Sequence, residues 1–208
     1  NGAYDELKRG VARLKELKPS LPVRARTVIH RYNYRVWSSI VKAAKEIGLD
    51  SISFLPADVS SSAFNRPEPW ENDRIDSVVI PKEELPELQR VMEALIKEYK
   101  EAFDYSFIAE SPEKLRKIAG HYAAIHGLNP YPLKHCTAPW VSAVIEADGT
   151  VRPCFFLDSI GNIKSESLLD ILNKKSSVAD RRQLDVQHNA TCQKCVCSLN
   201  LRPRHYAV

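Results

Sequence analysis

Hydrophobic residues recur at every third or fourth position in four stretches of the chain, which is the spacing of one helix face. We expect helices at 4–17, 34–47, 82–103 and 111–127. Two short runs rich in β-branched residues, 22–30 and 51–55, predict strands. The order helix, strand, helix, strand with tight connections predicts a parallel sheet with crossover helices. Because two strands cannot complete such a sheet, the pattern indicates the last part of a larger α/β layer.

The C-terminal third has a different pattern. Two β-rich runs, at 141–147 and 150–156, flank Asp148-Gly149, a dipeptide that strongly favours a tight hairpin. Gly161-Asn162 predicts another turn, and two short helices are expected after it. The sequence therefore predicts an α/β amino-terminal part and a small hairpin-and-helix part behind it.

Two segments mark the organisation of the chain. Residues 129–132, Asn-Pro-Tyr-Pro, break the helical pattern and place a domain boundary there, which gives domains 1–130 and 131–208. The long segment 57–77 leaves the end of a predicted parallel strand, where α/β folds place ligand sites. It is either a solvated surface loop or a substrate-facing one.

Composition and charge exclude several classes. The chain has 208 residues, with 30 basic and 26 acidic side chains and a net charge of +4, which is too small to indicate nucleic-acid binding. No apolar run approaches the roughly 20 residues that span a bilayer. The first residues carry no signal-peptide core, so we expect a cytoplasmic protein. The chain begins inside a predicted helix, as the C-terminal part of a longer protein would.

The five cysteines are clustered. Cys192, Cys195 and Cys197 lie within six residues, and Cys136 and Cys154 bracket the predicted hairpin. Chain reversal at the hairpin turn should bring the last two to the same end, and a Cys-x2-Cys turn can present two sulfurs to one metal. The pattern predicts a four-thiolate site, with Cys197 as an alternative ligand or a bystander.

The cysteine pattern also has to be weighed against roles that need no metal. Buried structural thiols, disulfides and a thioredoxin-like Cys-x2-Cys are disfavoured by the tight clustering, the odd count and the absence of a strand before the motif. Four thiolates accept either zinc or an iron–sulfur cluster. Four basic residues near the ligands in sequence could offset thiolate charge, although a solvated surface role is the more ordinary interpretation of each: Arg152, Lys194, Arg202 and Arg204.

Residues 130–200 resemble the SPASM domain, or its shorter relative twitch, of radical S-adenosylmethionine enzymes. The resemblance rests on Cys136-x12-Gly149-x4-Cys154 followed by Cys192-x2-Cys195, and on short stretches such as Ala138-Pro-Trp140 and Val151-Arg-Pro-Cys154. It implies an auxiliary 4Fe–4S cluster held by Cys136, Cys154, Cys192 and Cys195. The further cysteines of a second auxiliary cluster are absent, so one cluster is implied.

The same resemblance implies that residues 1–130 are the C-terminal strands and helices of a partial (β/α)6 barrel. Asn33 and the backbone near Leu55 would then be the candidates for contacts with S-adenosylmethionine, although a turn residue and a core residue are the more ordinary interpretation of each. The family's Cys-x3-Cys-x2-Cys motif is absent from this sequence. The chain as it stands is therefore not expected to cleave S-adenosylmethionine, and either a longer enzyme or a degenerate one is implied.

The function expected from the resemblance is that of the C-terminal part of a radical S-adenosylmethionine oxidoreductase or maturase, with an auxiliary cluster that transfers electrons. The implied partners are the missing N-terminal half of the barrel, an electron donor and a substrate, a peptide or a small molecule, that the sequence does not identify. The alternative is a non-catalytic zinc-binding structural or interaction module, because metal ligation contributes folding free energy. A metal-free domain with structural thiols is the third possibility for this chain.

Overall fold

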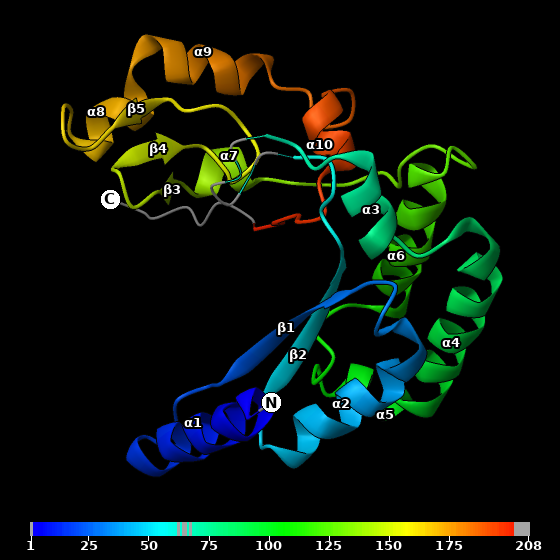
Figure 1. The fold of residues 1–208 in the computed structure, drawn as a ribbon. Coiled ribbons are helices and arrows are strands. Elements are labelled where there is room, and N and C mark those ends of the chain that lie inside the picture. The colour runs from blue at the N-terminus through cyan, green and yellow to red at the C-terminus, as the bar shows by residue number, and fades with distance from the viewer. Residues whose placement is uncertain (1, 62, 64–65, 67, 202–208) are drawn as a thin grey trace. The chain divides into compact units, whose positions relative to one another are not determined.

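The computed structural model describes residues 2–61, 63, 66 and 68–201. It is a mixed α/β structure that divides into two compact units. The first unit contains Asn1–Ala57 and Asn72–Pro130, and the second contains Asp58–Glu71 and Tyr131–Val208. Each unit has its own small sheet, which Figure 1 shows with its helices.

The first unit is built on two parallel strands. Strand β1 pairs with β2 in register from Arg24 opposite Ser51 to Ile29 opposite Pro56. Helices α2 and α6 pack on β2, and α4 packs on both helices (Figure 1). Its elements are α1 (Ala3–Leu17), β1 (Arg24–Ile29), η1 (Tyr34–Val36), α2 (Trp37–Glu46), β2 (Ser51–Pro56), α3 (Asn72–Val78), η2 (Lys82–Glu84), α4 (Leu85–Glu98), α5 (Lys100–Asp104) and α6 (Pro112–Ile125).

The periodicity places these elements well, with three exceptions. The helix expected over 82–103 ends at Glu98 and restarts at Lys100, because Tyr99 leaves helical geometry and donates its hydroxyl to the Ser38 carbonyl at 3.1 Å. Helix α3 forms inside the segment expected to be a loop. Helix α1 forms as expected, but of its apolar face only Val11 is buried. The two strands β1 and β2 alone do not show the partial barrel that the family resemblance implies.

Tyr122 of α6 fixes the carboxyl ends of both strands. Its buried hydroxyl donates to the Ile29 carbonyl at the end of β1 and accepts the Ala57 amide, just past β2, at 3.0 Å. Burial raises the pKa of this phenol well above its usual value, so it stays protonated and keeps its donor. One side chain therefore satisfies two backbone groups at the edge where parallel sheets bind ligands.

Glu110 is a buried carboxylate that contacts the backbone of β2. It accepts the Phe54 amide at 2.9 Å, and its charged neighbours are Lys114 and Arg26, whose charges oppose but do not overcome the effect of burial. Burial therefore raises the pKa of Glu110 above its ordinary value. An acid whose pKa is raised on folding stabilises the fold at low pH, and this contribution is lost as pH rises through the folded-state pKa.

We expect Glu110→Gln to alter the pH dependence of stability in one direction. Relative to wild type, the variant's unfolding free energy should rise as pH increases from about 4.5, by about 1.4 kcal/mol for each unit by which folding raises the wild-type pKa. Urea unfolding at a series of pH values measures this difference, in which the other titrating groups cancel. A difference that is flat with pH would show that Glu110 ionises normally.

The second unit carries a three-stranded antiparallel sheet in the order β3-β4-β5. Helix α8 packs on β5, and α9 packs on α8 (Figure 1). The fully buried Ile171 and Val151 lie in its core. Its elements are α7 (Ala138–Val141), β3 (Val144–Ile145), β4 (Thr150–Arg152), β5 (Gly161–Asn162), α8 (Leu168–Asn173), α9 (Lys175–Gln183) and α10 (Ala190–Lys194).

The predicted hairpin is present but shorter than expected, because the residues before Ser142 form α7 and those after Arg152 leave the sheet. Gly161-Asn162 forms strand β5, which pairs with β4, rather than a simple turn. The Asn162 side chain also donates to the Asp148 carbonyl at 3.2 Å. Across the part of the chain that the structure describes, no helix combines the length and apolar character needed to cross a bilayer.

Candidate metal centre

The Cys192-x2-Cys195 motif lies on a short helix and the turn that ends it. The Asn189 side chain begins α10 by accepting the Cys192 amide at 3.0 Å. After the helix, the Cys195 thiol donates to the Cys197 carbonyl at 2.8 Å, and the Cys197 amide approaches the Cys195 sulfur at 3.3 Å. The sequence thus folds locally into a turn that places a backbone donor against a thiol.

Residue 134 is tied to this turn although it is about 60 positions away in sequence. The Lys134 ammonium donates to the Gln193 carbonyl at 2.6 Å, and the Gln187 side chain donates to the Lys134 carbonyl at 2.6 Å. The Gln193 side chain in turn donates to the Gln187 carbonyl at 2.9 Å. These three bonds bring the chain just before Cys136 against the Cys-x2-Cys turn.

A second set of hydrogen bonds ties the chain just after Cys136. The Thr137 amide donates to the Leu199 carbonyl at 2.6 Å, and the Thr137 hydroxyl accepts the Leu201 amide at 3.0 Å. Because Cys136 lies between these two sets of bonds, its position relative to the cysteines at 192–197 is fixed from both sides.

Cys154 comes from the hairpin. Gly149 makes its turn possible: its φ of +90° suits glycine, and a Cβ there would lie 2.7 Å from Asn162 Oδ1. Beyond β4, the amides of Phe156 and Leu157 hydrogen-bond to the Cys154 sulfur and act to lower its pKa, although burial raises that pKa overall. Amide donors directed at a sulfur are a feature that tunes thiolate-bound centres.

The thiols are close enough to influence one another electrostatically. Cys154 is affected by Cys136 and Cys197, Cys192 by Cys154 and Cys136, and Cys195 by Cys197 and Cys154. Burial is the largest cause in each case, and it raises the pKa of Cys192 to about 11 and of Cys195 to about 12. Ligation of a metal would therefore release protons from thiols that are neutral at pH 7.

The cysteine side chains do not form a compact site for a single ion. Among the residues that the structure describes, no three cysteine, histidine, aspartate or glutamate side chains are close enough to hold a single metal ion. The predicted metal ligands thus lie in one region of the second unit without closing around one ion.

The two residues expected near S-adenosylmethionine lie at the sheet of the first unit. The Asn33 side chain closes the turn after β1, accepting the His30 amide at 2.9 Å and donating to the Val28 carbonyl at 2.9 Å. Leu55 lies in β2 opposite Val28. In the segment 57–77, which follows β2, Arg66 forms an ion pair with Asp58, while residues 62, 64–65 and 67 lie outside the described part of the chain.

The cation beside the thiols is one that sequence reasoning missed. Lys134 lowers the pKa values of Cys192 and Cys195, opposing the effect of burial. Of the four basic residues expected there, Arg152 pairs with Glu146 at 2.6 Å, Lys194 is exposed, and Arg202 and Arg204 lie outside the described residues. The one sequence signal for Lys134 as a cation near the thiols is its position two residues before Cys136.

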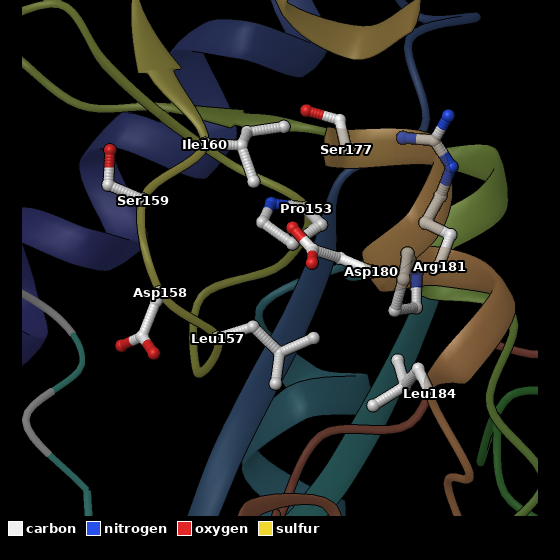
Figure 2. A pocket seen from close by; sticks show the side chains of 10 residues that line it. Pro153, Leu157, Asp158, Ser159, Ile160, Ser177, Asp180, Arg181 and Leu184 are labelled. Carbon is white, nitrogen blue, oxygen red and sulfur yellow. The ribbon is translucent and has the colours of Figure 1, made fainter. Parts of the chain in front are cut away.

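A pocket of about 250 Å³ lies elsewhere in the second unit, between residues 153–160 and α9 (Figure 2). The side chains of Pro153, Leu157 and Leu184 line it, together with Asp180 and Arg181, whose guanidinium donates to the Leu172 carbonyl at 2.7 Å. No cysteine lines the pocket, although Pro153 directly precedes Cys154. The pocket and the thiols are therefore separate features of one unit.

Comparison with known families identifies the type of the C-terminal region. Residues 136–196 match the model of SPASM, an iron-sulfur cluster-binding domain. The matched span begins at Cys136 and ends directly after Cys195, so it contains four of the five cysteines and leaves out Cys197. No curated protein and no solved structure matches the chain.

Proposed function

We propose that this chain binds one 4Fe–4S cluster through Cys136, Cys154, Cys192 and Cys195. The observation that carries the proposal is the placement of these four cysteines: all lie in the matched iron–sulfur span, and their thiols are near enough to affect one another's pKa values. Partial burial and the amide donors at Cys154 and Cys195 fit a thiolate-bound centre.

A cluster and a single zinc ion differ in the spacing that they require of four thiolates. Zinc binds sulfur at about 2.3 Å, so four thiolates around it must lie within about 4 Å of one another. A cluster takes each thiolate on a different iron atom and therefore holds its ligands farther apart. The match of residues 136–196 to an iron-sulfur cluster-binding domain is what favours the cluster.

The role that we propose is electron transfer within a radical S-adenosylmethionine enzyme of which this chain is the C-terminal part. A cluster with four cysteine ligands has no open iron, so it supplies electron transfer rather than substrate binding. The sequence contains no Cys-x3-Cys-x2-Cys motif, so cleavage of S-adenosylmethionine would require another part of the enzyme. The substrate, a peptide or a small molecule, and the electron donor are further partners in this proposal.

The first unit supports the barrel part of the proposal. No described strand pairs with the outer edge of β1, and Leu7 and Leu17 on α1 are 52% and 67% exposed. A missing N-terminal half of a (β/α)6 barrel would pair with that edge and cover these residues. In such a barrel Asn33 and the backbone of Leu55 would lie near S-adenosylmethionine, Asn33 by shaping the turn after β1.

Anaerobic reconstitution tests the proposal. We expect the chain, incubated with iron and sulfide under reducing conditions, to take up about four iron and about four sulfide and to turn brown, with broad absorption near about 400 nm. Metal analysis and visible spectra measure both. A parallel sample receives zinc alone.

Two results would contradict the proposal. Stoichiometric zinc uptake without stable iron uptake would favour the zinc-binding interaction module and remove the electron-transfer role. Uptake of neither metal would favour a metal-free domain with structural thiols.

A further inference from the structure

We propose that Lys134 is the principal counter-charge of this metal centre and that its ammonium raises the reduction potential of the cluster. The inference rests on the proposed cluster binding. It concerns a residue that lies outside the matched span of residues 136–196 and is not itself a ligand.

The Lys134 ammonium is held at the metal centre by two contacts. It donates to the carbonyl of Gln193, which lies between Cys192 and Cys195, at 2.6 Å. It also lies over the Tyr131 ring, 5.8 Å from the ring centre. The backbone of Lys134 is also held, because the Gln187 side chain donates to its carbonyl. A long side chain that is fixed at both ends keeps its charge in one place.

The other cations near the thiols in sequence are less suited to this role. Arg152 is neutralised by Glu146 at 2.6 Å and also donates to the Leu157 carbonyl at 3.1 Å. Lys194 is exposed, whereas Lys134 is half-buried and its ammonium binds the Gln193 carbonyl. Within the described part of the chain, Lys134 is thus a cation whose charged end is hydrogen-bonded to the turn between Cys192 and Cys195.

The effect of the charge follows from electrostatics. One-electron reduction makes the cluster and its four thiolates one unit more negative, and no bond forms or breaks. A fixed positive charge nearby stabilises the reduced state more than the oxidised state, and partial burial limits the screening by salt. Loss of the charge should therefore shift the potential to more negative values.

The test compares the whole chain, reconstituted anaerobically, with four variants. Lys134→Gln removes the charge but keeps a hydrogen-bond donor, Lys134→Met removes both, and Lys134→Arg keeps both. Lys194→Gln is the matched control, since it removes an exposed lysine next to Cys195. Each is titrated with dithionite, which supplies the electron, in the presence of redox mediators, while the visible spectrum reports cluster reduction.

We expect the two neutral variants at 134 to lose about tenfold in the equilibrium constant for reduction, a shift of about 59 mV to more negative potential for one electron. Lys134→Arg and Lys194→Gln should stay near wild type. Equal potentials in wild type and Lys134→Gln, or an equal shift in Lys194→Gln, would overturn the inference, as would loss of iron in both neutral variants, which would indicate a structural role. Failure of the wild type to bind iron would instead refute the proposed function.

Discussion

Cys154→Ser is expected to abolish cluster binding, with iron content falling to less than about a tenth of the wild-type value. Serine preserves size but replaces a thiolate ligand by a hydroxyl that is neutral at pH 7, and soft iron–sulfur centres select thiolates. Structural metal sites contribute on the order of 10 kcal/mol to the folding of small domains. We therefore also expect the second unit of the variant to become sensitive to proteolysis.

The four remaining cysteines make this prediction sharper. Ser variants at Cys136, Cys192 and Cys195 should behave like Cys154→Ser, whereas Cys197→Ser should keep its iron and serves as the matched control. Reconstitution followed by iron and sulfide analysis separates the cases. If Cys195→Ser keeps iron and Cys197→Ser loses it, Cys197 is the fourth ligand. Full retention of iron in the Cys154 variant would contradict the proposed site.

Sequence reasoning could predict the cysteines as ligands because their spacing is local information. A hairpin signal and a Cys-x2-Cys turn each determine the geometry of a few neighbouring residues. It did not reach Lys134, because the contact of Lys134 with Gln193 joins residues 59 positions apart and depends on the path of the whole second unit. Charge near a ligand in sequence pointed to Arg152 instead, which the hairpin turns toward Glu146.

The fold shows the same division between local and long-range information. Helical periodicity and the Ser111 N-cap placed α6 closely, because the cap bond to Lys114 spans only three residues. The break at Tyr99 was missed because it depends on Ser38, 61 positions earlier. The apolar pattern of α1 predicted a helix correctly but could not show how much of its face is buried.

Tyr122→Phe removes a single oxygen atom, yet we expect it to destabilise the first unit strongly. The buried Ala57 amide loses its acceptor and the Ile29 carbonyl loses a donor, and each buried group left unpaired costs about 1–3 kcal/mol. Tyr105→Phe is the matched control: the Tyr105 side chain is 80% exposed, and a substitution there should change stability by less than about 0.5 kcal/mol.

The measurement must report on the first unit alone, because the chain has two units and a single transition cannot be assumed. Trp37, which is fully buried beside Phe54, provides this signal once Trp70 and Trp140 of the second unit are replaced by phenylalanine. Urea unfolding followed by the fluorescence of Trp37 should then show a lower midpoint for Tyr122→Phe with an unchanged slope. Equal midpoints for the two tyrosine variants would mean that the strand ends are held by packing alone, and the hydroxyl bridge between β1 and β2 would lose its role in shaping that edge.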